Sequence, residues 1–122
     1  MSKTIGEVID ALERAKTDVQ VVFSFGYLVP TSVDSWRGIY AEAAIGYKYD
    51  GRYTDRPTVD ALLGELRNAI DGREYSGWKG GEFRYNRDTP LHVDNPDEYS
   101  CTEITSIEIK DWQVTLHTAR EE

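Results

Sequence analysis

Apolar residues recur at helical spacing at the very start of the chain. Thr4 and Glu7 have the spacing of a capping box, in which each residue satisfies a free backbone amide of the other. The polar residues that follow fall on the opposite side of the helix from the apolar ones. The pattern predicts a helix that ends near Lys16. Its apolar stripe comprises Ile5, Val8, Ile9 and Leu12.

Residues 19–25 change to β-branched and aromatic side chains, which are typical of a strand. Val19, Val21, Phe23 and Phe25 share one face, and Val22 lies on the other. Because both faces carry apolar residues, we expect an interior strand. Gly26 and Pro30 mark its end.

Helical spacing returns in residues 31–47, where Thr31 or Ser32 provides an N-cap. Gly38 and Gly46 weaken this helix by about 1 kcal/mol each relative to Ala. Residues 48–57 are polar and turn-rich and predict an exposed loop. The apolar positions of the helix are Trp36, Ile39, Tyr40, Ala43 and Tyr47.

A third helix is predicted to begin after Thr58 and to end before Gly72, the residue type that most often terminates a helix. Its apolar stripe comprises Val59, Leu62, Leu63, Leu66, Ala69 and Ile70.

From Gly77 onward the apolar period changes to two. Residues 83–85 and 91–93 predict one hairpin, across a turn that contains Asn86, Asp88 and Pro90. Residues 101–109 and 112–117 predict a second, longer hairpin with Lys110-Asp111 as its turn, and Trp112, Val114 and Leu116 on its apolar face. Residues 1–122 therefore form a single α+β domain. We expect about three helices packed on one face of a mostly antiparallel sheet of about five strands, which the early strand joins.

The charge and cysteine content of the chain limit the kinds of partner and the compartment that we expect. The 122 residues have a formal net charge of -8, and this argues against direct binding of nucleic acid, which needs Lys and Arg at the phosphates. The single cysteine, Cys101, excludes an internal disulfide and suits a reducing compartment. No apolar run is long enough for a membrane helix or a signal core. These features predict a cytoplasmic protein that does not bind membranes.

The glycine-rich segment Trp78-Lys79-Gly80-Gly81 is a candidate anion site, because consecutive glycines can direct backbone amides at one anion. A phosphate-binding loop requires a helix after its glycines, whereas a strand is predicted here. The alternative is a turn that leads the chain into the sheet.

His92 and His117 are the candidate metal ligands, together with Asp94, Asp97 or Glu98. Nothing in their spacing requires the two histidines to meet. Catalysis by Cys101 with a histidine has no supporting pattern, because no basic environment lowers the pKa of the thiol. We therefore predict no catalytic residues, no bound metal and no cofactor.

Arginine and aromatic residues gather in the predicted loops and on strand faces. Arginine binds phosphates in a bidentate manner and aromatic rings stack on bases, so this combination fits a nucleotide or a protein partner. The alternative is solvated arginines and core aromatics. The wider set includes Tyr49, Tyr53, Tyr85 and Arg87, and the ligand- or partner-binding residues that we predict from it are Arg37, Arg52, Arg56, Trp78, Lys79 and Arg84.

Three blocks of the chain resemble a group of small proteins encoded by bacteriophages: residues 35–40 (SWRGIY), 77–84 (GWKGGEFR) and 88–95 (DTPLHVDN). The resemblance spans most of the chain and implies no activity that could be transferred to particular residues. It implies a phage accessory factor acting in the host cell, and many such factors counter host defences.

Three functions follow as hypotheses. The first is a non-enzymatic inhibitor that binds a host defence protein, for example a CRISPR effector, through an acidic surface. The second is an oligomeric sponge that sequesters a nucleotide immune signal. The third is a small metal-dependent enzyme that uses His92 and His117.

Overall fold

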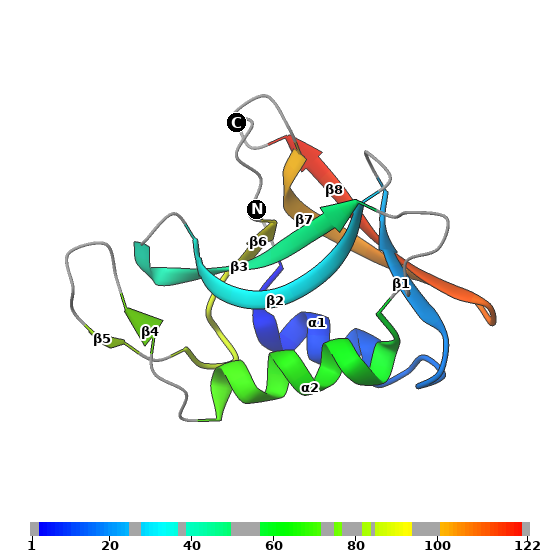
Figure 1. The fold of residues 1–122 in the computed structure, drawn as a ribbon, viewed down its shortest axis with the longest axis horizontal. Coiled ribbons are helices and arrows are strands. Elements are labelled where there is room, and N and C mark those ends of the chain that lie inside the picture. Colours follow the sequence, from blue (N-terminus) through cyan, green and yellow to red (C-terminus); the bar gives the residue numbers. More distant parts are fainter. Residues whose placement is uncertain are drawn as a thin grey trace.

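Two helices lie side by side beneath one curled sheet in the computed structural model (Figure 1). The structure describes residues 3–24, 28–36, 39–49, 57–71, 75–76, 82–83, 85–93 and 101–120. The α+β class, the mostly antiparallel sheet and the placement of the helices on one face are as predicted.

The helices are α1 (Ile5–Leu12) and α2 (Val59–Ile70). The strands are β1 (Gln20–Phe23), β2 (Leu28–Trp36), β3 (Ile39–Tyr49), β4 (Tyr75–Ser76), β5 (Glu82–Phe83), β6 (Leu91–Val93), β7 (Cys101–Ile109) and β8 (Gln113–Arg120).

Six strands form the main sheet in the order β1-β8-β7-β6-β3-β2, and β4 and β5 form a separate two-stranded ribbon. The pairs β2–β3, β6–β7 and β7–β8 are antiparallel, whereas β1–β8 and β3–β6 are parallel. The parallel pairs join segments that are far apart in the sequence. The early strand therefore does join the later sheet, as expected.

Both helix N-termini are capped as the sequence predicts. In α1, Glu7 N–H donates to Thr4 Oγ1 at 3.2 Å, and Thr4 N–H donates to Glu7 Oε1 at 3.0 Å, which completes the capping box. In α2, Ala61 N–H donates to Thr58 Oγ1 at 3.2 Å. The first helix ends at Leu12, earlier than the predicted Lys16.

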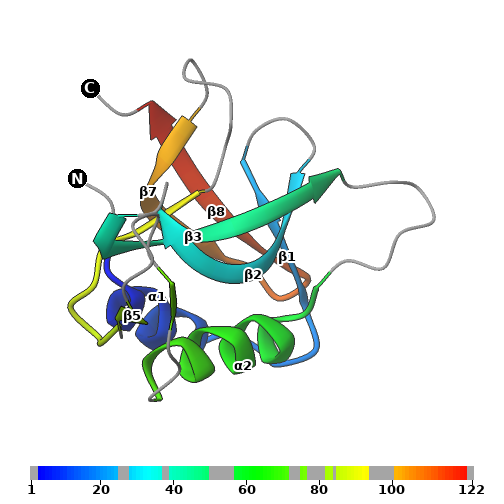
Figure 2. The same cartoon turned by 60° about the vertical axis from the view of Figure 1, so that its left-hand side comes forward.

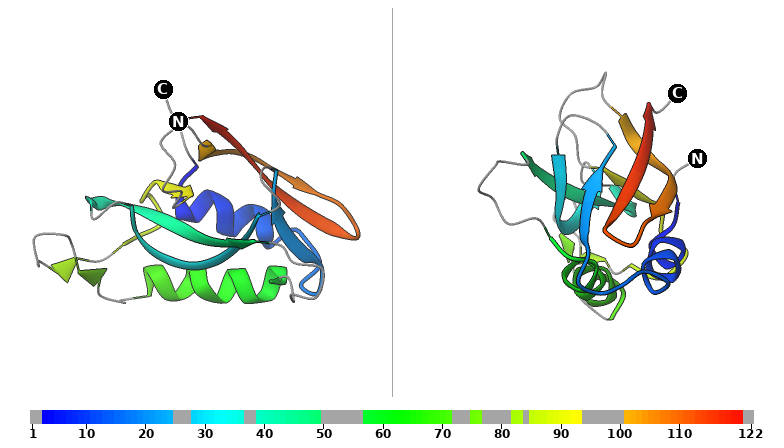
Figure 3. Two further views of the ribbon diagram at one scale, coloured as in Figure 1. Left: turned by 45° about the horizontal axis from the view of Figure 1, so that its top comes forward. Right: turned by 90° about the vertical axis from the view of Figure 1, so that its right-hand side faces the viewer.

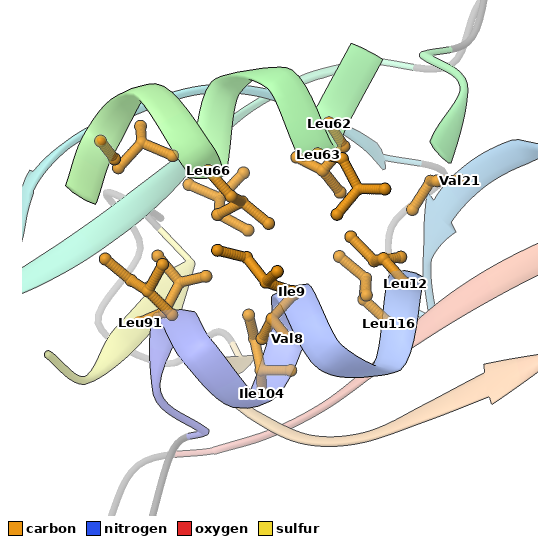
Figure 4. Packing of buried hydrophobic residues seen from close by; sticks show 14 of the residues in the cluster. Val8, Ile9, Leu12, Val21, Leu62, Leu63, Leu66, Leu91, Ile104 and Leu116 are labelled. Atoms are coloured by element: carbon orange, nitrogen blue, oxygen red, sulfur yellow. The ribbon is translucent and has the colours of Figure 1, made fainter. Parts of the chain in front are cut away.

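The core lies between the helices and the facing side of the sheet. Ile9 and Leu12 of α1 point toward the leucines of α2, and Val8 lies beside Ile104 of β7 (Figure 4). Figure 2 shows the sheet from a second side, with both helices again on one face. Val21, Leu91 and Leu116 complete this layer from three different strands. The helical stripes and the sheet therefore bury one another.

The helix predicted for residues 31–47 is wrong, because these residues lie in β2 and β3. The two strands pair directly, with Val33 opposite Ile45 and Ser35 opposite Ala43. Ala43, Ala44 and Ile45 are all fully buried, so β3 is covered on both faces. Two helices are present among the described residues instead of three, and β2 and β3 bring the main sheet to six strands.

The prediction that the first strand is interior is wrong. β1 lies at one end of the strand order. Its outer edge is covered by the segment that leads into α2: Val21 N–H donates to Pro57 O, and Val59 N–H donates to Val19 O, each at 2.9 Å. This cover explains why an edge strand is rich in valine.

The glycine-rich segment does not lead into the main sheet. Tyr75 pairs with Phe83 and Ser76 with Glu82, so residues 77–81 connect the two strands of the separate ribbon. The hairpin predicted from residues 83–85 and 91–93 is also wrong, because β6 pairs with β3 and β7. Phe83 instead pairs with Tyr75, which precedes the glycines in the chain.

Candidate interaction site

The ligand-binding set predicted from the sequence lies outside the described residues. Arg37, Arg52, Arg56, Trp78, Lys79 and Arg84 all fall there. Their grouping, and the nucleotide site built on it, stay predictions.

Three members of the wider arginine and aromatic set are described. Tyr49 is the last residue of β3, where it pairs with Leu28 of β2. The other two have structural roles. Tyr85 is 4% exposed and belongs to the core. Arg87 Nη2 donates to both carboxylate oxygens of Asp10 at 2.7 Å and to Gly6 O at 3.3 Å, which fixes the turn before β6 against α1. The bond to Asp10 raises the pKa of Arg87 above its ordinary value. Tyr85 therefore fits the alternative of core aromatics, and Arg87 is held at the surface in an ion pair with Asp10.

The turn and α1 approach so closely that residue 6 must be small. Gly6 N–H donates to Arg87 O at 2.9 Å, and a Cβ at position 6 would lie 2.9 Å from Arg87 Cβ. Such contact is closer than real side chains allow. The residues that follow this turn are also packed into the fold: Thr89, Leu91, His92 and Val93 are all buried.

The two histidines lie on the same face of the sheet, the one turned away from the helices, but on strands separated by β7. His92 pairs with Glu103, which pairs with Ala119, and His117 lies two residues from Ala119 on β8. Two strand spacings and two residues place their Cα atoms about 12 Å apart. Among the described residues, no group of three His, Cys, Asp or Glu side chains could hold a metal ion. The described histidines therefore do not converge on one centre.

His92 is buried, whereas His117 is half-buried and takes part in a surface network. His117 Nε2 lies 3.1 Å from Glu108 Oε1, and Lys110 Nζ lies 3.7 Å from Glu108 Oε2. The hydrogen bond from His117, and then the charge of Lys110, lower the pKa of Glu108. The network fixes side chains on β7, on β8 and at the start of their turn.

The β7–β8 hairpin is an arm whose turn extends beyond the helices (Figure 3). Lys110 N–H donates to Gln113 O at 2.9 Å, so the turn residues are Asp111 and Trp112, one position later than predicted. Trp112 is 66% exposed instead of lying on the apolar face with Val114 and Leu116. Sequence reasoning missed this residue because period-two alternation assigned it to the strand that begins at Gln113.

Charged groups surround the exposed ring. Lys110 Nζ lies 5.1 Å from the centre of the Trp112 ring, within the range of a cation–π interaction. Asp111 carries a 93% exposed side chain, with Lys16 Nζ 3.9 Å away, too far for a strong pair. We define residues 108–113 as the hairpin tip. It combines an exposed aromatic ring on a two-residue turn with accessible carboxylates.

A second surface feature lies where α1 passes β7. A hollow of about 400 Å³ is lined by Lys3, Glu7, Asp10, Ala11 and Arg14 from the α1 side, and by Ser106 and Ile107 of β7. We call it the α1–β7 hollow. Its walls are mostly charged, which is not typical of a site for an apolar small molecule.

No protein-family model matches the chain, and no curated protein or solved structure is detectably similar to it. No described helix has the length and apolar character that a membrane span requires.

Proposed function

We propose that the chain is a non-enzymatic binding protein that occupies a basic surface of a partner protein and uses the hairpin tip as its anchor. The observation that carries this proposal is the exposed Trp112 ring, presented on a two-residue turn beside Glu108 and Asp111. The phage-like blocks point to a host defence protein as the partner.

The geometry of the tip suits a protein interface. Tryptophan is enriched among residues that dominate binding energy, because its large rigid ring loses little entropy when it is buried. The bond from Lys110 N–H to Gln113 O fixes the backbone of the turn that carries Trp112 before binding, and Lys110 Nζ lies over the ring. Preorganisation of this kind raises affinity without additional contacts.

Charge supports a basic partner. The chain carries 22 acidic and 14 basic residues, and the carboxylates at the tip are accessible to solvent. Complementary charge increases the association rate and disfavours acidic competitors. Binding to a basic surface should therefore weaken as salt is raised from 50 to about 300 mM, where the Debye length falls below about 8 Å.

The test is binding of immobilised chain to candidate defence proteins from a bacterial host, measured at 50 mM NaCl. Trp112→Ala should weaken binding about 30-fold or more, which corresponds to the loss of at least about 2 kcal/mol at a dominant contact residue. Asn68→Ala, at an exposed position of α2, is the matched control and should bind as wild type.

Two results would contradict the proposal. One is that no defence protein binds even at 50 mM NaCl. The other is that a partner binds Trp112→Ala as tightly as wild type, which would move the interface away from the hairpin tip.

A further inference from the structure

β7 has an open edge over its second half. β6 is only three residues long and pairs with β7 at Glu103, and Lys3 N–H donates to Ile104 O at 2.9 Å. The chain before β6 does not continue along β7, because Pro90 bonds β3 instead. Among the described residues, none pairs with the side of residues 106–109 that faces away from β8.

Two isoleucines present their backbone groups to this edge. Lys110 N–H donates to Gln113 O, and from this bonded pair the pairs of the hairpin alternate between bonded and non-bonded. Ile109 and Ile107 therefore belong to non-bonded pairs, and their N–H and C=O groups point away from β8. Such a row of two donors and two acceptors is a template for an added strand.

The side chains along the edge alternate in chemistry as well as in direction. Ile107 and Ile109 lie on the helix side, where Ile107 packs against the core and Ile109 is 37% exposed. Glu108 lies on the opposite face, and its side chain is 46% exposed. Lys110 Nζ lies 3.7 Å from Glu108 Oε2, too far for a strong hydrogen bond, so this oxygen can accept one from a second cation.

The α1–β7 hollow gives an added strand room. Its β7 wall consists of Ser106 and Ile107 and its other wall is the side of α1, so the hollow of about 400 Å³ borders the open edge. Figure 3 shows β7 passing above α1. Ala11 contributes only a methyl group to the helix wall, so a short side chain fits opposite Ile107.

We propose that residues 106–109 bind an extended segment of the partner protein as an added antiparallel strand, through a run of one apolar, one basic and one apolar residue. This inference rests on the proposed function, which supplies the basic partner. The antiparallel direction is that of β6 on the same edge. The two apolar residues lie opposite Ile107 and Ile109 and exchange both backbone bonds with them, and the basic residue lies opposite Glu108.

The neighbours of the open edge keep the bound segment short. On one side Lys3 and β6 already occupy the edge at Ile104 and Glu103, and on the other side the turn begins at Lys110. A long strand, such as β7 of a second copy, would run into Lys3 and β6. The edge therefore fits a short segment of another protein.

Fluorescence anisotropy with a fluorescein-labelled peptide, Thr-Val-Lys-Val-Thr-amide, tests the added strand. The whole chain is titrated into the peptide at 50 mM NaCl, and saturable binding with a Kd below about 1 mM is expected. A peptide with Glu in place of Lys should bind at least tenfold more weakly. N-methylation of both valine amides, which bond β7, should abolish binding, whereas N-methylation of the lysine amide, which points away from β7, should not.

Variants of the chain test the same edge from the other side. Ile109→Pro removes an outward N–H that does not bond β8, and proline is tolerated at a strand edge, so it should weaken binding at least tenfold. Ile109→Val keeps the N–H and is the matched control. Glu108→Gln should abolish the preference for the lysine peptide over the glutamate peptide, and Glu65→Gln on α2 should retain it. Circular dichroism establishes that each variant is folded.

The proposal is overturned if none of the peptides binds, if the peptide methylated on both valines binds as well as the parent, or if Ile109→Pro binds as wild type. A wild-type dimer that Ile109→Pro dissociates in sedimentation equilibrium would also overturn it, because a second copy would then occupy the edge.

The peptide assay contains no defence protein, so its failure differs from failure of the proposed function. If no peptide binds but a defence protein binds through Trp112, the added strand is excluded and the anchor at the hairpin tip stands. If the peptide binds but a defence protein binds Trp112→Ala as tightly as wild type, the added strand stands and the anchor is excluded.

Discussion

Glu108 is a single carboxylate in the β7–β8 hairpin that makes the stability of the fold depend on pH. The hydrogen bond from His117 and the charge of Lys110 lower its pKa. A carboxyl group whose pKa is lower in the folded state stabilises the fold fully above its unfolded value, here 4.5, and this stabilisation is lost as the pH falls through the folded value. Glu7, whose pKa is lowered by the Thr4 backbone N–H, adds a contribution of the same sign.

We therefore expect the free energy of unfolding to decrease as the pH falls below about 4.5, and Glu108→Gln to reduce this dependence. Urea unfolding at several pH values between 3 and 7 measures the free energy of unfolding of the wild type and of Glu108→Gln. The difference between them should be largest near neutral pH and should narrow in acid. Glu65→Gln on α2 is the control. A difference that stays constant with pH would show that Glu108 does not act through its charge.

The β2–β3 hairpin shows how one apolar pattern can fit two elements. Trp36, Ile39, Tyr40, Ala43 and Tyr47 have helical spacing, but the odd-numbered residues from Ile39 to Tyr49 also alternate with period two. Aromatic and β-branched residues favour the strand, and Gly46 disfavours the helix. If the types of side chain had been given more weight than their spacing, the sequence would have predicted the two strands.

A substitution at Ile45 distinguishes the predicted helix from the observed strand experimentally. In the helical pattern it lies off the apolar stripe, whereas in β3 it is fully buried opposite Val33. Ile45→Ala should therefore cost about 2–5 kcal/mol of unfolding free energy, measured by urea denaturation. Val33→Ala, across the same pair, should also destabilise. A cost below about 0.5 kcal/mol for Ile45→Ala, the range of surface substitutions, would contradict the strand.

The elements that the sequence predicted well are those set by local contacts. The capping box of α1, the stripe of α2 and the β7–β8 hairpin each depend on residues close in the chain. The strand order was not predictable, because β1 pairs in parallel with β8 across about ninety residues. Trp112 was missed because period-two alternation placed it in the strand, whereas it lies in the two-residue turn.

The whole molecule carries one sign of charge in excess, and this has opposite consequences for folding and for binding. A net charge of -8 on a small domain is self-repulsive, whereas close pairs such as Arg67–Glu13 at 3.0 Å act locally and contribute little at the surface. Salt shortens the Debye length from about 30 Å at 0.01 M to about 10 Å at 0.1 M, so it screens the long-range repulsion most.

We therefore expect the urea midpoint of the isolated chain, measured by Trp fluorescence, to rise between 10 and 150 mM NaCl. Over the same range, affinity for a basic partner should fall. A urea midpoint that decreases with salt would mean that the local ion pairs outweigh the net charge, and the electrostatics of the whole molecule would then not favour a basic partner.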